Sequence, residues 1–232
     1  MGSSGGALVG GMHKAGISVN DVAEIMFETD FTKFANISRW QVALMILLCR
    51  DYLNNGEKLE KKLDQYLQGM TMDETEDLWI VTTDMCNGKV KIFDKSDVGF
   101  PVARAIRASV SIPVVWNPVK YKDGELYDGG IRYNFPVDFF DEDKGIPVVG
   151  VRMTQKFSGV KKSGIVQKIK SIAHNMIDAQ EDETTEDSKA ELIVELEDFG
   201  IGSTDFDISR EQKTDLMVQS YSTMQDALEQ LD

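Results

Sequence analysis

A serine near the start of the chain has the neighbours of an esterase nucleophile. Glycines stand two residues before and two residues after Ser4, in the run Gly2-Ser-Ser-Gly-Gly6. A nucleophilic serine of this kind lies at a sharp turn between a strand and a helix, and glycines at these two places relieve crowding in the turn. Ser3 lacks the pattern, because Met1 stands two residues before it. Ser4 is therefore the candidate nucleophile.

The residues after this turn predict the helix that such a site needs. Residues 7–16 are rich in alanine and glycine, which favours a helix that packs closely behind the turn. The N-terminus of a helix stabilises negative charge, so the backbone N–H of Gly5 is the oxyanion donor that the sequence identifies. A start rich in glycine and serine is by itself a weak signal, because purification tags have similar sequences.

Asp128 is the carboxylate of a second motif. It ends a predicted strand and precedes Gly129 and Gly130, which permit the close approach of another backbone. Most Asp-Gly pairs are simple turns. A carboxylate with a pKa of about 3.9 is also a weak base for a hydroxyl, so a catalytic role for Asp128 would require partial desolvation of the carboxylate.

A triad with histidine is one arrangement that the chain order allows. Ser4, Asp128 and His174 occur in the chain order of the α/β-hydrolases. However, His174 lies opposite the apolar stripe of a predicted helix over residues 163–179, so we expect it to face solvent. The stripe consists of Ile165, Ile169, Ile172 and Met176. His13 lies more than two helical turns beyond Ser4, which favours a surface or packing role.

Strands and helices alternate along the chain. Predicted strands cover residues 78–83, 90–93, 126–128, 147–153 and 192–196, and tight turns are expected at Asn87-Gly88 and Asp123-Gly124. Predicted helices cover residues 18–28, 38–54, 57–68, 100–108 and 209–231. This alternation indicates an α/β fold with a largely parallel sheet. We expect one domain over residues 1–232.

Composition and charge exclude several classes of protein. The 232 residues are 42% hydrophobic, and their formal net charge of −14 argues against nucleic acid as a partner. Cys49 and Cys86 have no metal-ligand spacing and do not form a disulfide framework. No apolar run is long enough to span a bilayer, and no signal segment opens the chain. We expect a soluble, cytoplasmic protein without a cofactor or metal.

Four motifs in this order resemble those of the patatin-like phospholipase family. They are the run from Gly2 to Gly10, Thr83-Asp84 after a strand, Arg107-Ala-Ser-Val-Ser-Ile-Pro113, and Asp128-Gly-Gly130 before Asn134-Phe-Pro136. The resemblance implies a three-layer α/β/α fold and a Ser4–Asp128 dyad, with Asp128 as the base, that forms an acyl-enzyme without a histidine. We therefore expect Ser4 at the start of a helix, with its hydroxyl within hydrogen-bonding distance of Asp128. We assign Asp84 and residues 109–113 to the architecture of the domain. Asp84 is expected to cap or hydrogen-bond at a strand end, and Ile112-Pro113 to form a rigid turn that helps place the loop bearing Asp128.

The resemblance also implies a part of the domain that this sequence does not contain. The family draws its oxyanion donors largely from a Gly-Gly-x-Arg/Lys-Gly loop before the nucleophile strand. The chain begins at the nucleophile turn. We therefore expect an N-terminally truncated domain that lacks its first strand or strands and hydrolyses esters poorly by itself.

Acyl esters of lipids, phospholipids or acylglycerols, are the substrate class that the resemblance implies. Residues 154–177 contain no acidic residue, and their lysines are a candidate contact for an anionic lipid surface. These lysines are Lys156, Lys161, Lys162, Lys168 and Lys170. An ordinary solvated helix face explains them equally well. The alternative to an enzyme is a catalytically silent lipid-binding or interaction module with the same fold.

Overall fold

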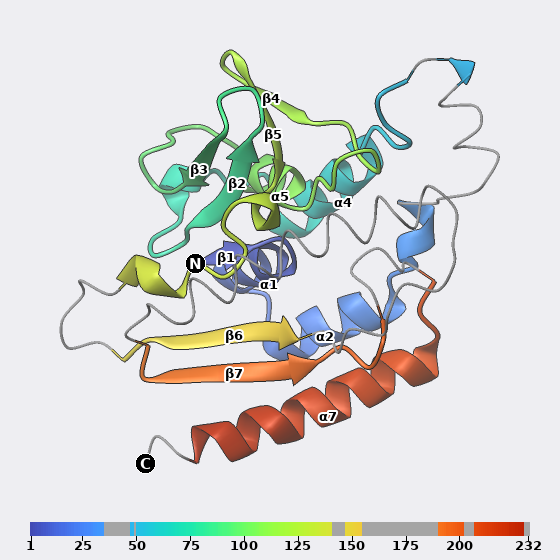
Figure 1. Ribbon diagram of the computed structural model, residues 1–232, viewed down its shortest axis with the longest axis vertical. Helices are drawn as coiled ribbons and strands as arrows, with labels where there is room; N and C mark the ends of the chain where they lie inside the picture. The colour runs from blue at the N-terminus through green and yellow to red at the C-terminus, as the bar shows by residue number, and fades with distance from the viewer. Residues whose placement is uncertain (35–46, 49, 141–146, 155–189, 202–206, 230–232) are drawn as a thin grey trace. The chain divides into compact units, whose positions relative to one another are not determined.

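A computed structural model describes residues 1–34, 47–48, 50–140, 147–154, 190–201 and 207–229 (Figure 1). The chain divides into two compact units, Met1–Asn134 and Phe135–Asp232, and each is described by itself. Both units combine strands with helices, so the predicted α/β class is confirmed. The single domain expected over residues 1–232 stays a prediction.

The first unit contains a five-stranded sheet built around β2 (Ile80–Asp84). β3 (Lys89–Phe93) pairs antiparallel with all five residues of β2. β1 (Gly2–Ser3) and β5 (Gly124–Asp128) therefore share the other edge of β2. There β1 pairs parallel with the first two residues of β2, and β5 pairs antiparallel with the last three. β4 (Val119–Tyr121) lies antiparallel to β5.

The two predicted tight turns are confirmed, and each one joins the strands of a hairpin. The Asn87-Gly88 turn joins β2 to β3, and Gly88 has the positive φ of 62° that a tight hairpin turn favours. The turn before Gly124 joins β4 to β5, with Lys122 at φ 53°. The sheet is consequently mixed: β1 and β2 are parallel, as expected, whereas the hairpin strands and β5 run antiparallel to their neighbours.

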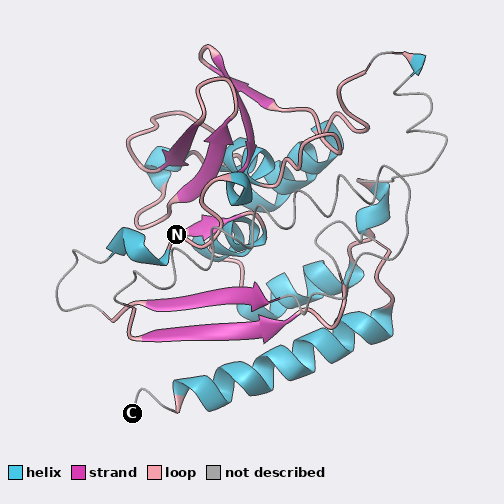
Figure 2. Ribbon diagram, in the orientation of Figure 1, coloured by secondary structure: helices cyan, strands magenta, loops and turns pink. Residues whose placement is uncertain are grey.

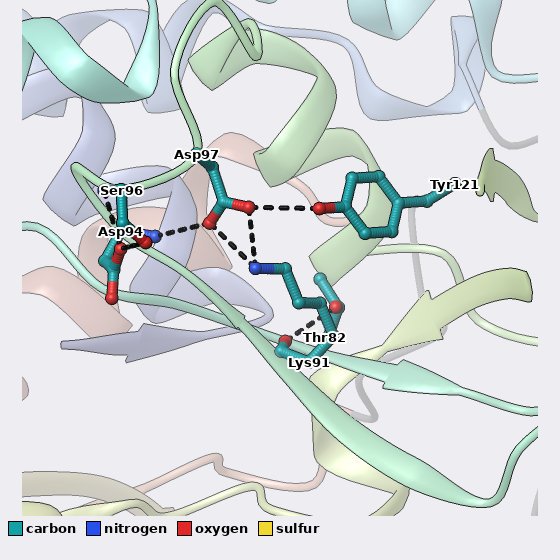
Figure 3. Close-up of polar contacts among 6 residues, drawn as sticks. All are labelled: Thr82, Lys91, Asp94, Ser96, Asp97 and Tyr121. Carbon is teal, nitrogen blue, oxygen red and sulfur yellow. Dashed lines mark hydrogen bonds and ion pairs between the residues drawn. The ribbon is translucent and has the colours of Figure 1, made fainter.

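A partly buried polar cluster ties β3 to the loop after it and to β4 (Figure 3). The ammonium of Lys91 lies 2.7 Å and 2.8 Å from the two carboxylate oxygens of Asp97, and the Tyr121 hydroxyl donates to the same carboxylate at 3.1 Å. On β2, the Thr82 hydroxyl donates to the carbonyl of Lys91 at 2.8 Å. The Thr82 bond adds to the pairing of β2 with β3, and the bonds to Asp97 fix the loop after β3 beside β4.

Four helices of the first unit are described: α1 (Gly5–Lys14), α2 (Val19–Glu28), α4 (Glu57–Leu67) and α5 (Val102–Ser109). Short 3-10 turns cover Phe31–Lys33, Met72–Glu74 and Gly129–Ile131. Ser18 caps α2 by accepting the N–H of Asp21, as its sequence predicts.

The helix predicted over residues 38–54 does not reach its expected end, and most of that range lies outside the described residues. Residues 50–54 are not helical. The N–H groups of Leu53 and Asn54 donate instead to the carbonyls of Val114 and Val115. A tertiary partner for these N–H groups has replaced the local helical one.

Close packing between α1 and α5 forms the core beneath the sheet. A Cβ added to Gly11 of α1 would lie 2.4 Å from the Ile106 side chain of α5, so glycine is what allows this approach. Ile106 itself is fully buried, as are Ala7 of α1 and Ala105 of α5. The small residues after the candidate nucleophile therefore do pack a helix tightly behind it.

The second unit contains the parallel pair β6 (Val149–Thr154) and β7 (Leu192–Glu197), and α7 (Arg210–Leu228) lies against β7 (Figure 2). A 3-10 turn covers Val137–Phe140. Ser209 and Gln212 form a capping box that starts α7. The two predicted strands and the last helix are confirmed. Among the described residues of both units, no helix combines the length and apolarity needed to cross a membrane.

Candidate active site

The carboxyl ends of β1 and β5 meet at one point on the edge of β2. β1 runs parallel to β2 and ends with Ser3 opposite Val81. β5 runs antiparallel and ends with Asp128 opposite Thr82, the next residue along β2. Residues that leave these two strand ends therefore emerge side by side, although 124 positions separate Ser4 from Asp128 in the sequence.

Ser4 forms the sharp turn between β1 and α1. It is the N-cap residue of α1 and has a φ of 49°, in the left-handed region that non-glycine residues rarely adopt. A Cβ added to Gly2 would lie 2.4 Å from the backbone carbon of Gly6, so the turn requires glycine at position 2. A Cβ added to Gly6 meets no atom within 4 Å outside its own helix. Of the two motif glycines, Gly2 is thus the one that the described structure requires for space.

The Ser4 hydroxyl donates to Oδ2 of Asp128 at 2.9 Å. Only 5% of Asp128 is exposed. Burial raises the pKa of Asp128 from 3.8 to about 6, and hydrogen bonds from the Gly130 N–H and the Ser4 hydroxyl partly offset this rise. At neutral pH the carboxylate is still ionised, yet it is a stronger base than an ordinary aspartate. The expected pairing of Ser4 with a desolvated Asp128 is what the structure shows.

The glycines after Asp128 allow the strand ends to come this close. A Cβ added to Gly129 would lie 2.5 Å from the Ser3 hydroxyl and 2.5 Å from the Val81 carbonyl oxygen. At Gly130 the clash would be with the Asn134 side chain, at 2.6 Å. The Gly130 N–H also donates to Oδ1 of Asp128 at 2.8 Å, which leaves Oδ2 for Ser4.

Ser109, at the end of α5, and Ser111, two residues after it, hold the backbone of Ser4 and Asp128. The N–H of Ser4 donates to the Ser109 hydroxyl at 2.9 Å, and that hydroxyl donates to the Val81 carbonyl at 2.7 Å. The N–H of Asp128 donates to the carbonyl of Ser111 at 3.0 Å. The sequence motif around residues 109–113 predicted support for Asp128 only. Its contact with Ser4 was missed, because no spacing rule joins two serines 105 positions apart.

Gly5 is the first residue of α1. The N–H groups of Ala7 and Leu8 donate to the Ser4 carbonyl and so are engaged within the first turn. The earliest N–H groups of a helix have no acceptor within it, and they attract negative charge. This position suits the oxyanion role expected of the Gly5 N–H, which stays a prediction.

Other residues named from the sequence are not part of this pair. Asp84 accepts the N–H groups of Cys86 and Asn87 in the β2–β3 turn, so it has the architectural place assigned to it. His13 is exposed in the last turn of α1. His174 and Lys156, Lys161, Lys162, Lys168 and Lys170 lie outside the described residues. Within the described part of the chain, no three His, Cys, Asp or Glu side chains are grouped to hold a metal ion.

The sequence is similar to a known family and to two uncharacterized proteins. The family model described as patatin-like phospholipase matches residues 1–141. An uncharacterized protein of Acanthamoeba polyphaga mimivirus is 30% identical over 151 residues, which cover 61% of this chain and 50% of that protein. The uncharacterized protein YqhO of Bacillus subtilis is 25% identical over 240 residues, which cover 93% of this chain and 82% of YqhO. The chain thus spans half the length of the viral relative it matches.

Proposed function

Because the chain belongs to the patatin-like phospholipase family, we propose that it is a serine hydrolase that cleaves acyl esters of lipids with Ser4 as nucleophile and Asp128 as base. The observation that carries the proposal is the 2.9 Å hydrogen bond from the Ser4 hydroxyl to a carboxylate that is only 5% exposed. A strained serine bonded to a buried base has the geometry of nucleophilic catalysis.

In the first half-reaction, Asp128 takes the proton of the Ser4 hydroxyl while Oγ attacks the ester carbonyl carbon. The tetrahedral intermediate carries an oxyanion, which the Gly5 N–H at the start of α1 is placed to stabilise. The bond from the carbonyl carbon to the alcohol oxygen then breaks. Asp128 returns its proton to that oxygen, so an alcohol leaves and the acyl group remains on Ser4.

The second half-reaction repeats these steps with water. Asp128 removes a proton from a water molecule, whose oxygen attacks the acyl-enzyme carbonyl. The bond from the acyl carbon to Ser4 Oγ then breaks, and Asp128 returns the proton to Oγ. This step releases a fatty acid and restores the resting site. One carboxylate thus acts as base and acid in turn, and a pKa near the working pH favours both directions of transfer. A pKa of about 6 meets this requirement better than 3.8.

Labelling by a fluorophosphonate probe tests the nucleophile directly. We expect the probe to modify Ser4, and Ser4→Ala to abolish both labelling and the hydrolysis of a fluorogenic acyl ester. Ser3→Ala is the matched control, because it removes the neighbouring hydroxyl, which has no hydrogen-bond partner in the described structure. Labelling at Ser3 would show that the wrong serine has been assigned.

Asp128→Asn tests the base. It keeps the shape of the side chain and removes its charge, and we expect turnover to fall by at least about 10³-fold while the protein stays folded. Unchanged turnover would rule out Asp128 as the base. A folded wild-type protein that binds lipid but neither turns over esters nor reacts with the probe would be the silent lipid-binding module instead. The lipid-surface contact of the lysines between residues 156 and 170 and a cytoplasmic location remain further parts of the proposal.

A further inference from the structure

We propose that Ser109 is a positioning residue for the nucleophile, an inference that rests on the proposed function of Ser4. Ser109 is the last residue of α5 and is fully buried. Its hydroxyl stands between two backbone groups of the site: it accepts the Ser4 N–H at 2.9 Å and donates to the Val81 carbonyl at 2.7 Å. A hydroxyl has one proton, so this arrangement uses the donor on Val81 and leaves the lone pairs for Ser4.

The register of the parallel strands shows what Ser109 replaces. The Gly2 N–H donates to the carbonyl of Trp79 at 2.9 Å. In a parallel ladder the next bond of this kind joins residues two positions further along each strand. That bond would run from the Ser4 N–H to the Val81 carbonyl. The Ser109 hydroxyl occupies this place and bonds to both groups, so one side chain is inserted into the ladder where the nucleophile turn begins.

The insertion gives Ser4 room to turn away from β2. With a direct ladder bond, Ser4 would continue the extended path of β1 and lie opposite Thr82, the position that Asp128 occupies. Its observed φ of 49° instead directs the chain into α1 and leaves the hydroxyl facing Asp128. Gly129 packs against the same Val81 carbonyl so closely that a Cβ at this position would lie 2.5 Å from its oxygen. The Val81 carbonyl therefore contacts both the hydroxyl that holds Ser4 away from β2 and the glycine that follows Asp128.

The segment after Ser109 also holds the base. The carbonyl of Ser111 accepts the Asp128 N–H at 3.0 Å. Seven of the eight residues of α5 are buried, so this segment begins from a rigid support. The backbones of Ser4 and Asp128 are thus each held by a hydrogen bond to the short segment from Ser109 to Ser111. Their 2.9 Å hydrogen bond is fixed by this shared anchor as well as by the sheet.

Loss of the Ser109 hydroxyl is expected to impair chemistry rather than substrate binding. In Ser109→Ala the Ser4 N–H and the Val81 carbonyl either stay without partners or close up into the ladder bond, which draws Ser4 from Asp128. A misplacement of about 1 Å at a reacting group costs on the order of 10²-fold in rate. We expect kcat for a soluble acyl ester to fall by about 10- to 100-fold, with KM changed less than about twofold.

A matched control separates positioning from general destabilisation. Thr75 is also buried, 3% exposed, and its hydroxyl donates to the Met72 carbonyl at 2.7 Å within the same unit. Thr75→Val removes one buried hydrogen bond away from Ser4 and should lower thermal stability without lowering kcat. Ser109→Cys is the second test variant, because a thiol keeps the volume of the site but is a weak acceptor, and it should lower kcat in the same direction as Ser109→Ala.

Amide hydrogen exchange gives a readout that does not depend on activity. We expect the Ser4 N–H to exchange faster in the two Ser109 variants and to keep its wild-type rate in Thr75→Val. If the wild-type protein neither turns over esters nor labels, the proposed function fails, while this exchange pattern still supports the anchoring of Ser4. Wild-type kcat together with unchanged Ser4 exchange in Ser109→Ala or Ser109→Cys would overturn the inference.

Discussion

Replacing Asp128 by asparagine should make the protein inactive, and the stability of this variant relative to wild type should rise from pH 5 to pH 8. Folding raises the pKa of Asp128 from 3.8 to about 6, because burial penalises the charged form. Between these two values the folded protein binds more protons than the unfolded chain, so the carboxyl group lowers stability as the pH rises from about 4 to about 6. Above about pH 6 the destabilisation by the buried, ionised carboxylate of Asp128 no longer changes with pH.

The magnitude follows from the same two pKa values. A rise of about 2 units in the pKa of Asp128 corresponds to about 3 kcal/mol of destabilisation at pH 8, where the carboxylate is fully ionised. About half of this cost is already present at pH 5. Asparagine carries no titrating proton, and the hydrogen bonds that it loses or keeps do not change with pH. The stability difference between Asp128→Asn and wild type should therefore become more favourable by about 1.5 kcal/mol from pH 5 to pH 8.

Urea unfolding followed by tryptophan fluorescence measures this difference, because Trp79 and Trp116 lie in the unit that carries the site. Asp73→Asn is the control. A hydrogen bond from the Gly99 N–H is the main cause that holds the pKa of Asp73 below its ordinary value, so this group is ionised in both the folded and unfolded chains from pH 5 to pH 8. Its stability difference should be flat over that range. A flat or falling difference for Asp128→Asn would refute the desolvated carboxylate and with it our account of the base.

Three further predictions follow from the site and its surroundings. The kcat/KM for a soluble ester should rise through pH 6 and level off above it, because only ionised Asp128 accepts the Ser4 proton; a midpoint near pH 4 would contradict the effect of burial. Gly2→Ala should lower the melting temperature and abolish fluorophosphonate labelling, because the added Cβ would lie 2.4 Å from the backbone carbon of Gly6. Gly6→Ala should keep the melting temperature or raise it. Equal losses in both variants would show that the turn is packed differently. Val114 has a φ of 70° and is exposed, so Val114→Asn should stabilise the protein by up to about 1 kcal/mol. Val98 is exposed but has no positive φ, so Val98→Asn should have little effect. A loss of stability in Val114→Asn would exclude backbone strain at that position.

Local patterns in the sequence were sufficient for most of the elements. The hairpin at Asn87-Gly88, the cap at Ser18 and the capping box that starts α7 depend on contacts between residues close in the chain. The predicted helix end at residue 54 was wrong, because the N–H of Asn54 bonds to Val115, far along the chain. Where the partner of a backbone group is distant, propensity and periodicity carry no information about it.

The motifs around Ser4 and Asp128 also identified the two residues that carry the candidate chemistry, since a strained nucleophile turn and a strand end each need glycine nearby. Sequence alone did not determine how they meet. That depends on β1 and β5 sharing one edge of β2 in opposite directions, so that their carboxyl ends converge at Val81 and Thr82. The raised pKa of Asp128 and the bond from Ser4 to Ser109 likewise exist only in the folded chain, because desolvation and long-range hydrogen bonds arise when distant segments pack together.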